Sequence, residues 1–100
     1  MDNDNVSQLM AVPTVQIDND RVIVTEWRFA PGAETGWHRH AHDYVVVPLA
    51  DGKLRITGLD GQTTEAALRH GVSYTRAAGV EHNVINANAF EFAFVEVELR

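Results

Sequence analysis

Four of the five histidines in this 100-residue chain are spaced in a way that could bring imidazoles together on one metal ion. His38, His40 and His42 alternate along one short segment, and His82 follows about forty residues later. Because side chains of an extended strand repeat every two residues, His38 and His40 should share a face. Two imidazoles on one face can bind a metal, and His82 from another strand is the candidate third ligand. The alternative is that His38 and His40 are surface residues and that His82 is an ordinary core residue.

The composition limits which metals and partners are possible. The chain has no cysteine, which excludes disulfide scaffolds, thiolate zinc sites and iron–sulfur clusters, so any metal must be bound by nitrogen and oxygen. Fourteen acidic and eight basic residues give a formal net charge of -6, and the basic residues are not clustered. A phosphate backbone needs concentrated positive charge, so we expect no nucleic-acid partner.

The amino-terminal segment, MDNDNVSQLM, carries two aspartates and no basic residue, unlike a secretory signal. No stretch approaches the roughly 18 apolar residues of a membrane span. We therefore expect a cytoplasmic protein with no membrane partner. Residues 1–12 are expected to form a tail or a dimer arm, and residues 13–100 a single domain. Because a small barrel exposes edge strands, a homodimer is also expected.

The body of the chain consists of short β-type runs separated by turn residues about every ten positions, which is typical of a sandwich or barrel. Asp60-Gly61 is a hairpin turn signal. On the last run, Glu96 and Glu98 are expected, like Glu34, to be solvent-exposed charges. The pattern predicts strands at 14–17, 21–29, 44–49, 53–59, 62–68, 72–76, 82–85 and 90–99, and the fold class is therefore all-β.

The segments around both histidine groups resemble the two signature motifs of the cupin superfamily. The first motif, Gly-x5-His-x-His-x3or4-Glu-x6-Gly, is similar to residues 32–44, GAETGWHRHAHDY, with Gly52 following. The second, Gly-x5-Pro-x-Gly-x2-His-x3-Asn, is similar to residues 71–86, GVSYTRAAGVEHNVIN. The resemblance implies the family's double-stranded β-helix, a small jelly-roll-like barrel. These segments also look like a small bacterial cupin group linked to β-alanine degradation.

Carried over residue by residue, the resemblance implies that His38, His40 and His82 are the metal ligands. Tyr44 stands where the family has a metal-binding glutamate, with Asp43 one residue earlier. A one-residue bulge could bring Asp43 inward instead of Tyr44. The fourth position is therefore left open between Asp43, Tyr44 and water.

Without the glutamate, the site is similar to the three-histidine variant of cupin oxygenases, which include thiol dioxygenases and a diketone-cleaving dioxygenase. The resemblance implies a divalent metal ion, Fe(II) first, with Zn, Mn, Ni or Co as alternatives. Three neutral ligands leave the full +2 charge on the site, which favours a small anionic or chelating substrate. Two other classes remain as alternatives: a non-catalytic cupin that binds or senses a small ligand, and a metal-dependent isomerase.

Two further residues are candidates for catalysis. Arg76 occupies a position that is apolar and points into the barrel in most cupins. A buried guanidinium needs an anion, so Arg76 is expected to orient a substrate carboxylate. The alternatives are an ion pair with Glu26, Glu81 or Asp43, or an outward-facing side chain. Tyr44 shares the strand parity of His40 and is expected either to donate its phenol hydrogen to substrate or oxygen, or to pack as an ordinary strand aromatic.

Overall fold

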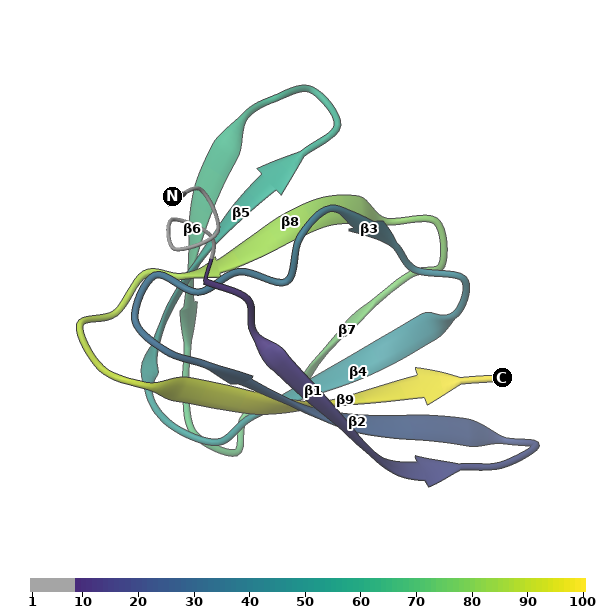
Figure 1. The fold of residues 1–100 in the computed structure, drawn as a ribbon. Coiled ribbons are helices and arrows are strands. Elements are labelled where there is room, and N and C mark those ends of the chain that lie inside the picture. The colour runs from purple at the N-terminus through teal and green to yellow at the C-terminus, as the bar shows by residue number, and fades with distance from the viewer. Residues whose placement is uncertain (1–8) are drawn as a thin grey trace, which may run out of the picture.

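The structure is a computed structural model and describes residues 9–100, in which it contains β-strands and no helix (Figure 1). Within that range no helix is long and apolar enough to cross a membrane. The pattern of short alternating runs is thus confirmed as all-β. The strands are β1 (Val12–Asp18), β2 (Val22–Phe29), β3 (His38–Arg39), β4 (Asp43–Pro48), β5 (Gly52–Gly58), β6 (Thr63–Leu68), β7 (Tyr74–Arg76), β8 (Glu81–Asn86) and β9 (Phe92–Leu99).

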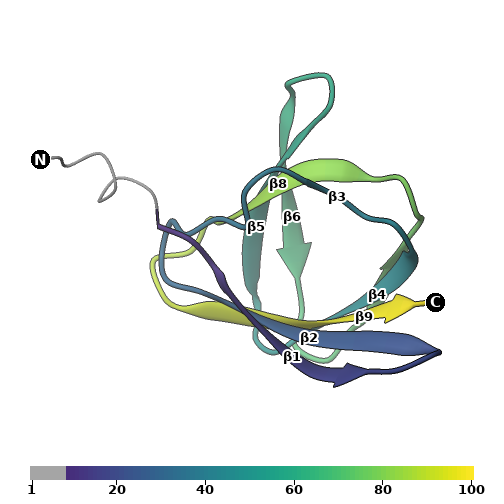
Figure 2. The ribbon, with the colours of Figure 1, turned by 45° about the vertical axis from the view of Figure 1, so that its right-hand side comes forward.

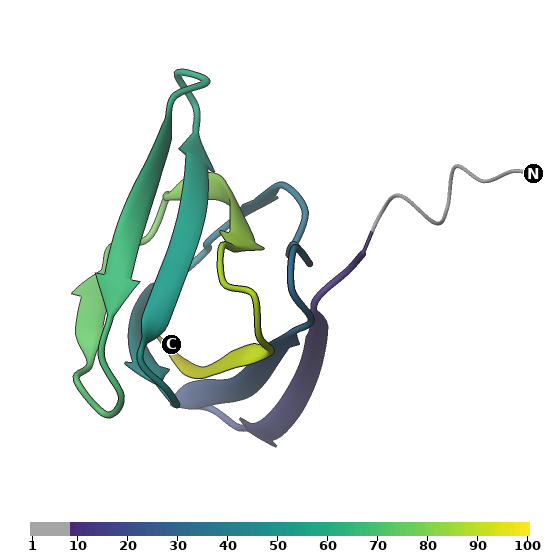
Figure 3. The same ribbon diagram turned by 90° about the vertical axis from the view of Figure 1, so that its left-hand side faces the viewer.

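The strands form two antiparallel sheets that face each other around a barrel interior (Figure 2). The five-stranded sheet has the order β1-β2-β9-β4-β7, and the four-stranded sheet has the order β3-β8-β5-β6. Strands far apart in sequence are therefore neighbours, as β2 and β9 or β3 and β8 show. Figure 3 shows the β5–β6 hairpin extending beyond the barrel. This is the double-stranded β-helix that the two motifs implied.

The expected amino-terminal arm lies only partly within the described residues, because residues 1–8 are outside them. The backbone N–H of Ala11 donates to the carbonyl of Glu34 at 2.8 Å, and the N–H of Glu34 donates to the carbonyl of Leu9 at 3.0 Å. Ala11 is buried in the main apolar cluster. Residues 9–11 are thus fixed against the segment that leads into the first histidine motif.

One end of the inner face of the five-stranded sheet is apolar. Phe29 lies opposite Phe92, and Trp27 lies opposite Phe94 in the β2–β9 register. The ring centroids of Phe29 and Phe94 are 5.5 Å apart. Phe92 and Phe94, the two phenylalanines on β9, are both buried. Leu54 of the facing sheet belongs to the same cluster. Burying these large side chains provides the main driving force for closing the barrel.

The other end of the same inner face is polar, because the alternation of β9 continues with acidic residues. Glu96 lies opposite Val46 of β4, and Glu98 lies opposite Tyr44. Arg76 of β7 lies on the other side of Tyr44. Since cross-strand neighbours share a face, these polar side chains come from three adjacent strands onto one patch of the barrel wall. This patch faces the histidine-bearing strands and positions the candidate site.

Candidate metal centre

The two histidine segments lie side by side in the four-stranded sheet, where β3 pairs with β8. His38 on β3 lies directly opposite His82 on β8 in the strand register, and His40 follows two residues after His38. The Nε2 atoms of His38 and His40 are 3.0 Å apart, and those of His40 and His82 are 3.2 Å apart. His40 and His82 are buried, and His38 is partly buried. The three ring nitrogens therefore converge on one point, as a shared ion requires.

The spacing of these nitrogens can be tested against the size of a bound ion. Bonds from metal ions to histidine nitrogen are about 2.0–2.1 Å long. At that length, Nε2–Nε2 separations of 3.0 and 3.2 Å correspond to angles of roughly 90° and 100° at the ion. The first angle is close to the roughly 90° of an octahedral ion, and the second lies midway between that value and the roughly 109° of a tetrahedral one. Both separations therefore suit a single ion shared by the histidines.

The local backbone selects the tautomer of His38 that a metal ligand needs. Its Nδ1 lies 2.9 Å from the carbonyl oxygen of Gly36, and a carbonyl can only accept a hydrogen bond. The hydrogen must therefore be on Nδ1, which leaves the lone pair on Nε2 free to bind an ion. The Thr35 hydroxyl lies 3.2 Å from the same Nδ1 and helps to hold the ring.

His40 is held by the loop of the second motif. The N–H of Gly79 donates to the His40 carbonyl at 2.8 Å, and the His40 N–H donates to the carbonyl of Val80 at 2.9 Å. Gly79 has a φ of 96°, a conformation that residues with a Cβ rarely adopt. On the side of the ring away from the other histidines, a carboxylate oxygen of Glu98 lies 3.9 Å from Nδ1. The motif-two glycine thus has a direct part in placing a motif-one histidine.

Burial keeps the two inner histidines neutral. Burial lowers the pKa of His40 to about 4, and the neighbouring His38 and His82 add to the effect. Burial likewise lowers the pKa of His82 to about 4, with contributions from His38 and from the positive charge of Arg76. A neutral imidazole can bind a metal ion and a protonated one cannot. Near neutral pH, His40 and His82 can therefore bind a cation without first losing protons.

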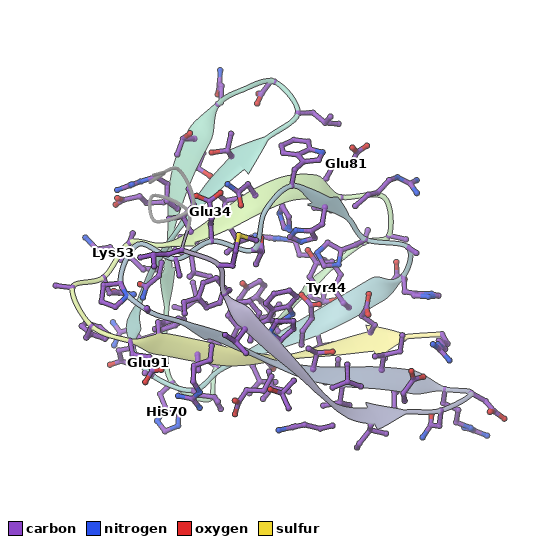
Figure 4. All side chains as sticks on the ribbon, viewed as in Figure 1. Glu34, Tyr44, Lys53, His70, Glu81 and Glu91 are labelled. Atoms are coloured by element: carbon purple, nitrogen blue, oxygen red, sulfur yellow. The ribbon has the colours of Figure 1, made fainter. Side chains whose placement is uncertain are left out.

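Tyr44, labelled in Figure 4, is a buried residue of β4 next to His40. It is 2% exposed, and its ring stacks on that of His40. Its hydroxyl has no hydrogen-bond partner in the described part of the chain. Burial, followed by the nearby carboxylate of Glu96, raises the pKa of the phenol, so it is a hydrogen-bond donor at all ordinary pH values. Tyr44 therefore packs as a strand aromatic, and its hydroxyl is a donor without a partner within residues 9–100.

Asp43, the acidic candidate for the fourth ligand, lies away from the three converging nitrogens. Asp43 is exposed, and its carboxylate accepts a hydrogen bond from the backbone N–H of Ala78 at 2.8 Å. Among the described residues it does not join the cluster with His38, His40 and His82. This hydrogen bond links the start of β4 to the loop between β7 and β8.

Arg76 is solvent-exposed rather than buried, and its side chain is among those that line the cavity with His38 and His82. Its guanidinium carbon is 5.2 Å from the centre of the Tyr74 ring, and no carboxylate within residues 9–100 forms an ion pair with it. None of the three ion pairs given as alternatives is found there. Arg76 thus presents an unpaired cation near His82, where an anionic ligand could reach it.

The expectation that Glu96 is a solvated charge is wrong, because Glu96 is only 8% exposed and lines the cavity. Burial, followed by the neighbouring Glu98, raises the pKa of its carboxyl to about 7, while a contact with Trp27 lowers it. The signal was present in the sequence: Glu96 shares the face of Phe92 and Phe94, which are core residues. At this position the alternation of the strand overrides the preference of a charged residue for solvent.

The cavity is narrow and mixed in character. The volume of the cavity is about 410 Å³ when its open mouth is included. Only about 20 Å³ of this volume lies far enough from the walls to hold the centre of a water molecule. That is enough for about one water molecule. Its apolar walls come from both sheets, and its polar lining comprises Thr35, His38, His82, Tyr44, Tyr74, Arg76 and Glu96.

Comparisons with known proteins agree with this geometry. The family model for the cupin domain matches residues 25–98. The chain is 66% identical over 90 residues to the β-alanine degradation protein BauB of Pseudomonas aeruginosa, which covers 90% of this chain and 94% of that protein. A cupin domain from Bordetella pertussis has a crystal structure with a TM-score of 0.91 and 58% identity, covering 94% of this chain and 97% of that one. An RmlC-like cupin with a double-stranded β-helix fold from Methanocaldococcus jannaschii has a TM-score of 0.75 at 14% identity, over 93% of this chain and 83% of that one. The resemblance seen in the two histidine motifs is thus confirmed, and the chain belongs to the cupin family.

Proposed function

We propose that this cupin is an Fe(II)-dependent dioxygenase that acts on a small anionic or chelating metabolite. The observation that carries the proposal is the convergence of three histidine nitrogens at separations of 3.0 and 3.2 Å. Facial sets of ligands with open positions are typical of non-haem Fe(II) oxygenases. The missing acidic ligand keeps the +2 charge of the ion available to an anion.

In this proposal the metal supplies Lewis acidity and electrons for the reaction of the substrate with O₂. His38, His40 and His82 hold the ion. Arg76 pairs with an anionic group of the substrate at the cavity mouth, and two parallel donors let it fix the orientation of a carboxylate. The hydroxyl of Tyr44 donates a hydrogen bond to the substrate, which supplies the partner that this buried group lacks. The narrow cavity restricts access of bulk water.

The name of one relative supports a metabolite of this size. The Pseudomonas protein, which is 66% identical, is named for β-alanine degradation, the breakdown of a small carboxylate-bearing compound. The unpaired Arg76 and the narrow cavity suit such a compound better than a polymer or a bulky ring system.

The test is anaerobic loading with Fe(II), followed by measurement of oxygen uptake with panels of small acids, thiols and diketones. We expect uptake with at least one compound, one bound iron per chain, and loss of both in His38→Ala and His82→Ala. His42→Ala and His70→Ala are matched controls, because neither residue joins the cluster in the described chain, and they should retain both properties. Absence of uptake with every class, at full iron loading, would falsify the proposal. Ligand binding without consumption would then favour a sensing cupin.

A further inference from the structure

Asn83 directly follows the candidate ligand His82 on β8, at a position that the second cupin motif leaves variable. Successive side chains of a strand point to opposite faces, so Asn83 lies on the face of the sheet away from the converging nitrogens. Its Oδ1 accepts a hydrogen bond from the backbone N–H of Gly36 at 3.0 Å. Gly36 lies two residues before His38, so Asn83 connects the strand of one ligand to the segment that leads into the strand of another.

Glu34 sets the orientation of the Asn83 amide. It is partly buried, is labelled in Figure 4, and forms a β-bridge with Ile85 of β8. The Nδ2 of Asn83 donates to a carboxylate oxygen of Glu34 at 2.8 Å. An ionised carboxylate only accepts hydrogen bonds, so the amide must turn its nitrogen toward Glu34 and its oxygen toward the N–H of Gly36.

Gly36 is the residue through which this contact reaches the metal position. Its carbonyl oxygen accepts the hydrogen bond from Nδ1 of His38 at 2.9 Å, the bond that selects the tautomer of the ligand. Gly36 has a φ of 83°, and glycine has more backbone freedom than any other residue. A side chain that holds the N–H of Gly36 therefore limits how far its carbonyl can turn away from His38.

We propose that Asn83, oriented by Glu34, is a positioning residue for the metal ligand His38. It holds Gly36 so that the Gly36 carbonyl keeps the imidazole in the tautomer and orientation that direct Nε2 to the ion. The inference rests on the proposed function insofar as the three histidines hold a metal ion. It goes further by assigning a role to two side chains that neither cupin motif contains.

The test is the affinity for Co(II), measured in competition with a chelator. Asn83→Ala removes both hydrogen bonds and should weaken Co(II) binding by roughly tenfold, the lower end of the effect that partners of metal ligands usually have. Asn88→Ala is the matched control. Asn88 also bonds to backbone groups, the N–H and the carbonyl of Lys53, but within residues 9–100 it has no hydrogen bond to residues 34–38. This variant should unfold more easily and keep the Co(II) affinity of the wild type.

An exchange of side chains separates positioning from general stability. Asn83→Asp keeps an acceptor for Gly36 but places a second carboxylate beside Glu34, so it should also weaken Co(II) binding. Glu34→Gln alone keeps a carbonyl oxygen for the Asn83 amide and should bind Co(II) as the wild type does. The double variant with Glu34→Gln and Asn83→Asp restores the hydrogen bond between these positions with donor and acceptor exchanged. It should regain most of the affinity that Asn83→Asp loses.

Wild-type Co(II) affinity in Asn83→Ala would overturn the inference, as would a double variant that binds no better than Asn83→Asp. If Asn83→Ala does not fold, the comparison of Asn83→Asp with the double variant decides the matter. Failure of the proposed function is distinct, because absence of oxygen uptake would remove the dioxygenase and leave these affinities as they are. A wild-type protein that binds no Co(II) would overturn both.

Discussion

The ring of Tyr44 stacks on the imidazole of His40, with centroids 3.8 Å apart and planes 19° from parallel. Tyr44 stands at the motif position where cupins usually have a glutamate, so an aromatic face replaces a carboxylate beside the metal position. The stack supports the ligand ring from one side and brings a phenol into the cavity wall. The hydroxyl that results has no partner within residues 9–100. The replacement therefore changes the charge of the site and adds a donor to it.

Tyr44→Phe separates the stacking from the hydroxyl. A buried hydroxyl without a partner costs about 1–3 kcal/mol, so we expect the metal-free variant to be as stable as the wild type or more stable. Metal content should be unchanged, and oxygen uptake with a substrate should fall at least tenfold. Tyr44→Ala should instead lose about 3–5 kcal/mol, because it also removes the ring. Denaturant unfolding and metal analysis check these outcomes; a clear loss of stability in Tyr44→Phe would show that the hydroxyl has a partner after all.

Glu98 should strengthen metal binding at His40. Its carboxylate oxygen is 3.9 Å from His40 Nδ1, on the ring side opposite the converging nitrogens. At this distance the carboxylate forms no hydrogen bond with the ring and acts through its negative charge, which favours a cation bound at the other nitrogen. We expect Glu98→Gln to weaken Co(II) binding by about tenfold in competition with a chelator. Glu65→Gln, at an exposed ion pair on β6, serves as the control, and equal affinity in both variants would rule out this role for Glu98.

Glu96 should make the stability of the metal-free protein depend on pH. Its pKa is raised from the usual 4.5 to about 7, so the folded state keeps a proton that the unfolded chain has already released. Stability is therefore lost as pH rises from about 4.5 through 7. Glutamine does not ionise, so Glu96→Gln removes this loss. Because one pKa unit corresponds to about 1.4 kcal/mol, the free energy of unfolding of the variant should exceed that of the wild type by up to roughly 3 kcal/mol at pH 8.

Denaturant unfolding of both metal-free proteins between pH 4 and pH 8 measures the difference. The gap should be small at pH 4 and should widen only within that window. A gap that does not change with pH would mean that Glu96 ionises normally in the folded protein.

Spacing and alternation in the sequence predicted a sandwich or barrel, and the resemblance to the two cupin motifs added the barrel topology and the meeting of the three histidines. His38 and His82 lie opposite each other because two-residue periodicity and strand pairing fix their faces. The position of the Asp43 side chain could not be predicted in the same way, because its carboxylate accepts a hydrogen bond from the backbone N–H of Ala78, 35 positions away. Only the closed sheet brings that N–H beside β4.

Gly52, which follows the first motif, is required by packing rather than by backbone conformation. A Cβ at this position would lie 2.7 Å from Cε1 of Phe92, and the Phe92 ring is 1% exposed and cannot move aside. We expect Gly52→Ala to cost about 1–3 kcal/mol, as overpacking of a core does, and to lower Tm by several degrees. Gly58→Ala at the other end of β5 is the control, because its Cβ would meet no atom closer than 3.6 Å. It should unfold within about 0.5 kcal/mol of wild type. Equal unfolding midpoints for the two variants would mean that the Phe92 ring can yield, and the constraint at Gly52 would then have to lie elsewhere.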